Sequence, residues 1–320
     1  MRMSARGGID LGGTKIQAVV VDDSGAVVGQ SRHPTPTAGG PPDVATTMAE
    51  AIREAAGEAG TEAAELEGLG VGSPGVVDDA DGTVSDAGNL PDWDAPFPLA
   101  DVLSKDLGVP VALGNDVQVA TNAEVALGAG RGVSSLLGVF WGTGVGGGIV
   151  LEGKPWLGRS AAGEIGHMVV KNHGRRCPCG RRGCMEAYAG RLALERRARK
   201  LHERGEKTDL FKIMEKRGRD RLSSGVWARA LKRGDPLAAS LLDEAVDALG
   251  AGIASAVNLL DVEAVVIGGG MGIRLGEPYL RRIQAEMTPH LFAESRPPEV
   301  LLAELGDLGG AIGASLLARR

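Results

Sequence analysis

The sequence contains one local pattern twice: an apolar strand, a glycine turn and a second strand. The first copy is IDLGGTKIQAVVV, where the turn at 10–15 leads into the β-rich run Lys15–Val21. The second copy is LLGVFWGTGVGGGIVL, with its turn at 142–148. Helical and strand patterns alternate after each hairpin. This weak internal duplication predicts a chain built from two α/β domains.

We place the boundary between the domains near 125, which gives a smaller domain over 1–125 and a larger one over 126–306. In the first domain, the Ala- and Glu-rich spacing at 43–60 predicts a helix with Asp43 as its N-cap. A ligand is expected in the cleft between two such domains.

Composition and charge narrow the class of protein. Apolar residues make up 43% and charged residues 24% of the chain, the balance of a soluble globular protein. The net charge of −6 disfavours a nucleic-acid partner, because phosphate binding needs a positive patch. The uncharged run 132–151 is rich in glycine and indicates two buried strands rather than a membrane helix. With no signal-peptide pattern, we expect a cytoplasmic protein without a membrane partner.

Glycine turns end three apolar strands, at 10–15, 142–148 and 268–272. Glycine lets the backbone approach a phosphate closely, so that its N–H groups can hold the oxygens. Any one of these turns alone indicates only a tight turn, but the three together favour phosphate binding. Side-chain donors would come from Thr14, Lys15 and Thr143, and Asp10 could hold Mg²⁺ directly or through water.

Two familiar motifs are excluded by their surroundings. Gly142, Gly144 and Gly147 satisfy the G-x-G-x-x-G dinucleotide pattern, but that pattern requires a following helix and the sequence continues as IVLEGKPW, which is typical of a strand. GIVLEGK resembles a P-loop, but Pro155 occupies the position of the Ser or Thr that would hold Mg²⁺.

All three cysteines, Cys177, Cys179 and Cys184, lie within eight residues, and His167 stands ten positions before the first. In a reducing compartment clustered cysteines bind metal more often than they form disulfides. Cys₃His is a structural zinc set that leaves no open position for water. We therefore predict a structural Zn²⁺ that fixes the segment 164–186.

Asn115 and Asp116 stand where a strand becomes a helix, and two interpretations stay open. Asn115 could cap the helix and Gln118 could complete a capping box. Alternatively, Asp116 could accept a proton from a hydroxyl nucleophile. Asn89, Glu164 and Glu186 are each more often solvated or loop-capping residues, although the two glutamates bracket the His/Cys cluster.

The motifs IDLGGTK, GSPGVVD, NLPDW, GND, GTGVGGGIV, GEIGH and H-x9-C-x-C-x4-C-x-E together resemble the ROK family (repressors, open reading frames, sugar kinases) over essentially the whole chain. The resemblance is greatest to its bacterial glucokinases. It implies an actin/hexokinase-like α/β fold of two ribonuclease-H-like domains around an interdomain cleft. The C-terminal helix, about 307–320, would cross back to the first domain.

The resemblance also implies roles for individual residues. Asp116 is similar to the catalytic base, and Asn115 to a contact with the sugar 3- and 4-hydroxyls. The remaining sugar contacts would be Gly75, Asn89, Glu164, His167 and Glu186. The nucleotide contacts would be Asp10, Gly12, Gly13, Thr14, Lys15, Gly142, Thr143, Gly144, Gly269 and Gly270. The zinc ligands would be His167, Cys177, Cys179 and Cys184, and the second ring nitrogen of His167 could meet a sugar hydroxyl. Loss of the zinc is expected to lower sugar affinity and turnover together, with ATP binding less affected because the nucleotide turns lie elsewhere.

We therefore predict an enzyme that uses ATP with Mg²⁺ to phosphorylate a hexose at its 6-hydroxyl. Glucose is the first candidate, followed by N-acetylmannosamine, N-acetylglucosamine, mannose and fructose. A family repressor would carry a helix-turn-helix domain before the first glycine turn, where this chain has nine residues. An NAD-dependent dehydrogenase would rest on the 142–147 match alone. From the family, a homodimer or homotetramer is expected. Two features depart from the family pattern: Trp141 before the second turn, and the long segment 89–103, which could reshape one rim of the sugar pocket.

Overall fold

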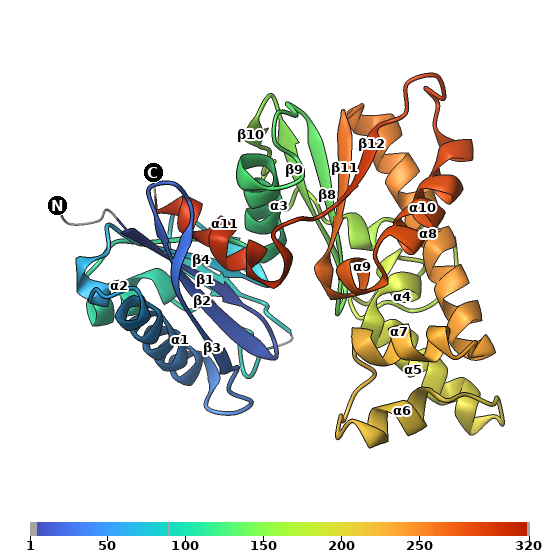
Figure 1. Ribbon diagram of the computed structural model, residues 1–320, viewed down its shortest axis with the longest axis horizontal. Coiled ribbons are helices and arrows are strands. Elements are labelled where there is room, and N and C mark those ends of the chain that lie inside the picture. The colour runs from blue at the N-terminus through green and yellow to red at the C-terminus, as the bar shows by residue number, and fades with distance from the viewer. Residues whose placement is uncertain (1–4, 89, 319–320) are drawn as a thin grey trace. The chain divides into compact units, whose positions relative to one another are not determined.

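The structure is a computed structural model that describes residues 5–88 and 90–318 (Figure 1). The chain divides into two compact units, Met1–Arg131 with Pro155–Ala162 and Asp307–Arg320, and Gly132–Lys154 with Gly163–Gly306. The predicted boundary near 125 lies within helix α3 (Asp116–Leu127), so the division falls after that helix instead. Residues 155–162 belong to the first unit, whereas the sequence analysis placed them in the larger domain over 126–306.

The first unit contains a five-stranded sheet in the order β3-β2-β1-β4-β7. The first three strands form an antiparallel meander, and β4 and β7 run parallel to β1. The strands are β1 (Ala5–Leu11), β2 (Lys15–Asp22), β3 (Val27–Pro34), β4 (Leu69–Ser73) and β7 (Val111–Asn115), with a separate hairpin of β5 (Val76–Asp78) and β6 (Thr83–Ser85). The helices are α1 (Gly40–Glu58), α2 (Leu99–Leu107), α3 and α11 (Gly309–Leu317), with short 3₁₀ turns at Ala63–Glu65 and Gly306–Leu308.

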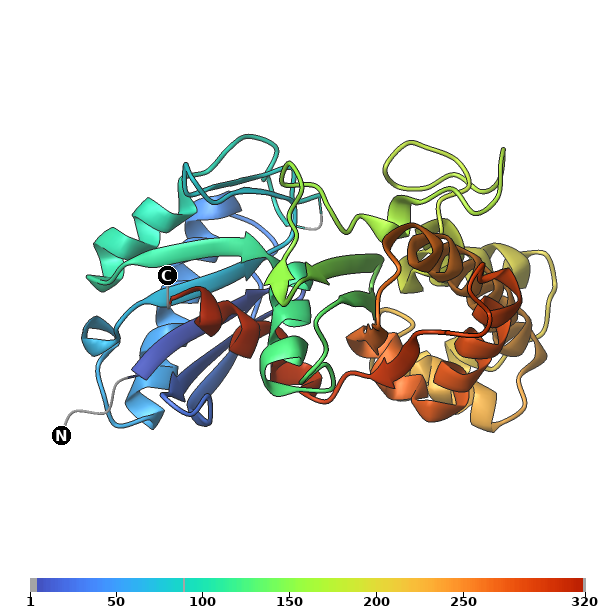
Figure 2. The ribbon, with the colours of Figure 1, turned by 90° about the horizontal axis from the view of Figure 1, so that it is seen from above.

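Alternation along the strands divides the core of this unit between two faces. Ile9 and Val20 pack with α1, whereas Val19 and Val21 pack with α11 on the opposite face. Glycine makes the second contact possible: a Cβ on Gly70 of β4 would lie 1.7 Å from the Ala314 carbonyl oxygen of α11. The α11 helix therefore lies directly on the sheet, which can be followed in Figure 2.

Helix α1 begins earlier than predicted. Its N-cap is Gly39, with φ of 84°, and prolines occupy the first turn. The prediction that Asp43 caps this helix is wrong, because proline at the first helical positions needs no N–H partner and lets the helix start at Gly40.

The second unit has a sheet of the same design, in the order β10-β9-β8-β11-β12. β8 and β9 form an antiparallel hairpin, and β11 and β12 run parallel to β8. The strands are β8 (Leu136–Trp141), β9 (Val145–Leu151), β10 (Lys154–Pro155), β11 (Ala264–Gly268) and β12 (Glu299–Leu302). The helices are α4 (Glu186–Ala189), α5 (Arg191–Glu203), α6 (Leu210–Lys216), α7 (Ser224–Lys232), α8 (Pro236–Leu260), α9 (Gly269–Leu275) and α10 (Glu277–Met287), with 3₁₀ turns at Ile165–His167 and Thr288–His290.

Each sheet thus consists of a three-strand antiparallel part extended by two strands parallel to its first member. This topology confirms the prediction of two ribonuclease-H-like domains, and the G-x-G-x-x-G stretch is a hairpin turn rather than a dinucleotide motif. Across residues 5–88 and 90–318, no helix is long and apolar enough to cross a membrane.

Candidate functional site

The carboxyl ends of the parallel strands bring Asp10 and Asn115–Asp116 to one edge of the first sheet. Asp10 of β1 pairs in register with Gly72 of β4, and the next residue of β4, Ser73, pairs with Asn115 at the end of β7. Ligands of open parallel sheets bind outside this edge. The edge therefore carries two carboxylates and an amide from separate parts of the sequence.

Asn115 and Asp116 form the junction between β7 and α3. The Asn115 Oδ1 atom accepts hydrogen bonds of 3.1 Å from the backbone N–H groups of Val117 and Gln118, so Asn115 is the N-cap. The Asp116 Oδ1 atom accepts from Val117 N at 2.8 Å, and the Gln118 amide donates to Asn122 Oδ1. The capping interpretation of Asn115 is thus correct, but it uses only the amide oxygen and leaves the carboxylate of Asp116 a separate candidate.

The first glycine turn joins β1 to β2 and is held at both ends. Gly12 N donates to Lys15 O at 2.9 Å, and the Thr35 hydroxyl donates to Gly12 O at 2.6 Å. Thr14 is exposed at the tip, beside Gly13. The turn is thus held by backbone and side-chain bonds and carries an exposed hydroxyl beside its glycines, the kind of turn that can bind phosphate.

Asp10 is partly buried at the base of that turn. Burial raises the pKa of its carboxyl group, an effect opposed by the Lys15 ammonium and reinforced by Asp307. The Lys15 Nζ atom donates to the Asp307 carbonyl oxygen at 3.4 Å. A partly buried carboxyl with a second acid close by fits a Mg²⁺ site, since Mg²⁺ is usually held by one or two carboxylates and water. Asp307 was not among the predicted residues.

Two further predicted sugar contacts belong to the first unit. Gly75 follows β4 with φ of 87°, and a Cβ there would lie 2.4 Å from Ser85 O, so the backbone itself requires glycine. Asn89 lies outside the described residues. The long segment after it is anchored, because the buried Trp93 donates from Nε1 to Val84 O at 2.9 Å and packs edge-on against Phe97.

In the second unit, the turns after β8 and β11 lie side by side. Gly142 N donates to Gly144 O at 2.9 Å, and a Cβ on Gly142 would lie 3.9 Å from Gly270 N. Gly269 has φ of 77°, and a Cβ there would lie 2.5 Å from Trp141 O. The 268–272 stretch is a strand-to-helix junction whose glycines let α9 start against the second turn. The two turns predicted to hold phosphate thus form one surface.

Trp141 is fully buried rather than part of that surface. Its indole Nε1 donates to Ala189 O at 2.6 Å, and its ring packs against Tyr279. The tryptophan therefore joins the end of β8 to α4.

Arg191 contacts the second turn and was missed by the sequence analysis. Its Nη2 donates to Thr143 Oγ1 at 3.0 Å, and its backbone N donates to Gly142 O at 3.1 Å. The only available signal was an arginine directly after the Gly190 that follows the cysteine segment.

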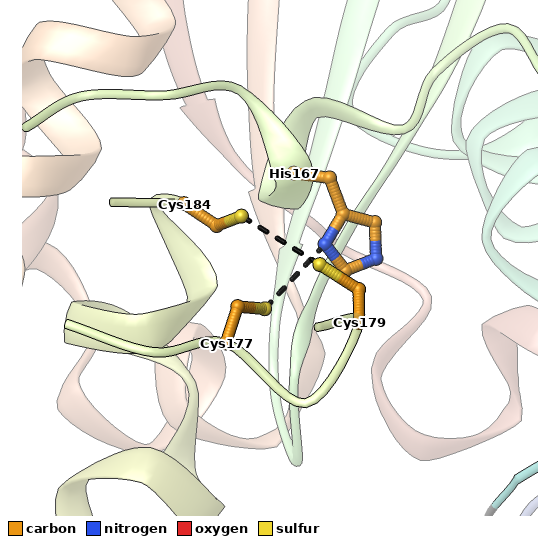
Figure 3. Close-up of side chains that lie close together, drawn as sticks. All are labelled: His167, Cys177, Cys179 and Cys184. Carbon is orange, nitrogen blue, oxygen red and sulfur yellow. Dashed lines mark hydrogen bonds between the residues drawn. The ribbon is translucent and has the colours of Figure 1, made fainter. Parts of the chain in front are cut away.

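The predicted zinc ligands come together. The candidate ligand atoms of His167, Cys177, Cys179 and Cys184 all lie within 4.8 Å of one another (Figure 3). Cys177 Sγ is 3.7 Å from His167 Nδ1, and Cys179 Sγ is 3.7 Å from Cys184 Sγ. Ligands on a tetrahedral zinc with bonds of about 2.0–2.3 Å are separated by roughly 3.6–3.8 Å. The donor set and its spacing therefore fit zinc.

Thiol acidity differs within this cluster. Burial raises the pKa of the Cys177 thiol to about 12. Burial also acts on Cys179, but hydrogen bonds from Arg181 and the neighbouring thiols outweigh it and lower the pKa to about 7. Since zinc binds cysteine as thiolate and burial raises the pKa of Cys177, binding zinc as Cys₃His must release protons.

The two glutamates that bracket the cluster differ in their surroundings. Glu164 Oε2 lies 3.8 Å from His167 Nε2, too far for a direct hydrogen bond, and its side chain is 58% exposed. Glu186 Oε2 accepts from Val145 N at 3.0 Å, and its Oε1 lies 3.8 Å from Cys177 Sγ. Glu186 thus links the second turn to the cluster, so the expectation that the turns lie apart from the zinc segment is wrong for 142–148.

Comparison with known proteins gives matches along the whole chain. A model described as ROK family matches residues 6–320. A glucokinase from Thermotoga maritima is 32% identical, with 98% of this chain and 96% of the relative covered. An N-acetylgalactosamine kinase from a Shewanella species is 35% identical, with 97% and 95% covered. A crystal structure of a ROK family glucokinase from Streptomyces griseus, in complex with glucose and AMPPNP, superposes with a TM-score of 0.86 at 34% identity, covering 99% of each chain.

Proposed function

We propose that this chain, which belongs to the ROK family, is a hexose kinase. It would transfer the γ-phosphoryl group of ATP to the 6-hydroxyl of glucose. The observation that carries this proposal is the first sheet's carboxyl edge, where Asp10 and Asp116 stand beside a phosphate-type glycine turn. The full-length similarity to glucokinases supports the choice of glucose.

Asp116 is the proposed general base. A carboxylate there would accept the proton of the 6-hydroxyl as that oxygen attacks phosphorus, and the bond from the γ-phosphorus to the bridging oxygen of ADP breaks. The Val117 N–H that donates to Asp116 Oδ1 restricts the carboxylate to one orientation. Asn115, fixed by its capping bonds, would offer its amide N–H₂ to the sugar 3- and 4-hydroxyls.

Phosphate binding is assigned to the glycine turns and to Lys15. When bound, Mg²⁺ neutralises charge on the transferring phosphoryl group, and Asp10 is the residue that would hold it, directly or through water. The surface formed by Gly142–Gly144 and Gly269–Gly270 would receive the rest of the nucleotide, with Thr143 and Thr14 as hydroxyl donors.

The zinc segment is assigned to the sugar. A zinc ion held by Nδ1 of His167 and the three thiols would fix the imidazole, so that its Nε2–H faces the carboxylate of Glu164. A gap of 3.8 Å between those two groups is wide enough for both to bind one sugar hydroxyl. Glu186 and Gly75 would complete the contacts, together with Asn89.

Kinases of other hexoses remain the second candidate, and the relative named for N-acetylgalactosamine favours keeping acetylated sugars in any test. We also propose a cytoplasmic location, where thiols stay reduced and available to zinc, and a homodimer or homotetramer. Neither assignment is needed for the chemistry.

A coupled ADP-release assay across a panel of hexoses tests the proposal. The panel contains glucose, mannose, fructose, N-acetylglucosamine, N-acetylmannosamine and N-acetylgalactosamine, each with MgATP. We expect the highest kcat/KM with glucose and no sugar-dependent ADP release with 6-deoxyglucose. A higher kcat/KM with an acetylated sugar would reassign the substrate, and ADP release that no hexose stimulates would contradict a hexose kinase.

A further inference from the structure

Arg191 is the first residue of α5 and is bonded on two sides. Its Nη2 donates to Thr143 Oγ1 at 3.0 Å, and its Nη1 donates to Leu222 O at 3.3 Å. The start of α5 is also bonded to the second glycine turn through its backbone: Arg191 N donates to Gly142 O, and Leu192 N donates to Thr143 O. The guanidinium is consequently held at a defined position on that turn.

Among residues 5–88 and 90–318, the acid that stabilises this cation is shared with a second arginine. That acid is Glu195, which itself accepts from Arg199 at 2.7 Å and from Leu222 N at 3.1 Å. Arg221 is a like charge close by, and partial burial together with this repulsion lowers the pKa of Arg191. A cation at the start of a helix is also opposed by the helix dipole. An anion bound at the turn would offset the cost of burying the cation, its repulsion from Arg221 and the unfavourable helix dipole.

We propose that Arg191 is a phosphate-binding residue of the nucleotide site, contacting the α- or β-phosphate of ATP and ADP and fixing the hydroxyl of Thr143. It rests on the proposed kinase function, which supplies the nucleotide. Of the five N–H donors of a guanidinium, two are used in the bonds to Thr143 and Leu222 among the described residues. The others are available to phosphate oxygens.

The bond to Thr143 also determines what that threonine can do. Because the Thr143 oxygen accepts from Arg191, its own O–H is directed elsewhere and can donate. Thr143 is exposed at the tip of the turn, beside Gly142 and Gly144. Arg191 thus acts twice, as a direct donor and as the group that orients a second donor.

Direct titration with nucleotides tests this assignment without relying on turnover. For Arg191→Met, the Kd for ADP should rise at least about tenfold, the change expected when a charge-assisted hydrogen bond is lost. The Kd for adenosine should change less than about twofold, on the same scale, because adenosine has no phosphate. Arg196→Met is the matched control, since Arg196 is exposed on the same helix, and it should bind both ligands as the wild type does.

Arg191→Lys and Thr143→Val complete the experiment. Lysine keeps the charge but not the planar fork, so it should restore only part of the ADP affinity. Combining Arg191→Met with Thr143→Val should weaken ADP binding by less than the product of the two single effects, because the residues act together. Circular dichroism and thermal melting of each variant check that it is folded, and Arg191→Lys carries the test if the methionine variant is not.

Two results would overturn the assignment: ADP affinity within twofold of wild type in a folded Arg191 variant, or equal losses for ADP and adenosine. The test of this phosphate contact is independent of the test of the hexose kinase activity. A wild-type protein that binds ADP through Arg191 but phosphorylates no hexose would refute the kinase and not the phosphate contact. An active hexose kinase whose Arg191→Met variant binds ADP normally would refute only the contact.

Discussion

The two sheets have the same strand order, but their carboxyl edges carry different side chains. In the first sheet the edge bears Asp10 at the end of β1 and Asp116 directly after β7. In the second sheet the corresponding first strand, β8, ends in the buried Trp141, and β11 ends in Gly268. A common topology thus supplies two glycine turns, whereas the acid–base and magnesium chemistry is assigned to one copy only.

The turns also differ in what holds them. Thr35 and the bond from Lys15 to the Asp307 carbonyl hold the first turn, all within one unit. The second turn is held by Glu186, the first residue of α4, and by Arg191, the first residue of α5, both shortly after the cysteine segment. We infer that damage to the zinc cluster reaches the second turn and not the first.

The largest effect is expected for the acid edge. Asp116→Asn keeps the size of the side chain and its ability to accept from Val117 N, but removes the base. We expect kcat to fall at least about 10²-fold, the usual contribution of a general base, with an unchanged melting temperature. Steady-state kinetics beside Asp79→Asn, an exposed control in the same unit, measures this. A near-wild-type kcat would leave Asp116 only a structural role.

The zinc cluster should give the next largest effect. Cys179→Ser should lose the metal, raise the KM for glucose and lower kcat, together by about 10–100-fold in kcat/KM. Because Glu186 joins the cluster to Val145, ADP affinity should fall too, by a smaller factor.

Elemental analysis and ADP titration check these changes, with about one zinc per chain expected in the wild type. His173→Asn is the control, since His173 lies in the same segment with φ of 56°, which asparagine tolerates, and should keep its zinc. Full activity in metal-free protein would show that the cluster does not shape the site.

A smaller effect is expected where Glu164 and His167 face each other. Glu164→Gln keeps the shape but weakens acceptance from a sugar hydroxyl, so the KM for glucose should rise by about three- to tenfold with bound zinc retained. Glu152→Gln, exposed in the same unit, is the matched control. If KM stays constant, Glu164 is a solvated residue with no part in sugar binding.

The smallest expected effect is a gain in stability on removing the Asp10 charge. Since burial raises the Asp10 pKa in the folded state, the charged form destabilises the fold above that pKa, and stability is recovered as the pH falls toward the ordinary carboxyl value. Asp10→Asn should therefore be as stable as wild type or more stable by up to about 1 kcal/mol at pH 7, while losing activity.

Urea unfolding at several pH values tests this sign. The advantage of the asparagine should shrink as the pH falls through the raised pKa. Marked destabilisation by Asp10→Asn at pH 7 would mean that the carboxylate is a structural partner, contrary to its proposed role as a magnesium ligand.

The sequence was sufficient for the hairpins, because period-two apolar patterns around glycine turns depend on local geometry. It was also sufficient for the zinc cluster, because cysteine is rare here and all its copies lie in one segment. It failed where a contact joins distant segments without a local pattern. Asp307 reaches the first turn from the far end of the chain, and Arg191 meets Thr143 through the packing of α5.

Helix starts and unit boundaries were harder to predict for a related reason. Helix α1 is capped by Gly39 and not by Asp43, because prolines form its first turn. From sequence alone, an aspartate inside the first turn of a helix cannot be told from one at the N-cap. The unit boundary falls six or so residues after 125, since α3 continues through that position to Leu127. Gly70 is required by the packing of α11 on the sheet, a contact between distant segments that no local pattern in the sequence indicates.

Identification of the phosphorylated product tests the central claim most directly. The wild-type protein is incubated with MgATP and uniformly ¹³C-labelled glucose, and the mixture is followed by ³¹P and ¹³C NMR. We predict equal amounts of ADP and glucose phosphorylated at carbon 6, with the C6 resonance split by phosphorus, and no such product from Asp116→Asn over the same time. Phosphate on another carbon, or ADP with inorganic phosphate and unchanged glucose, would contradict a hexose 6-kinase.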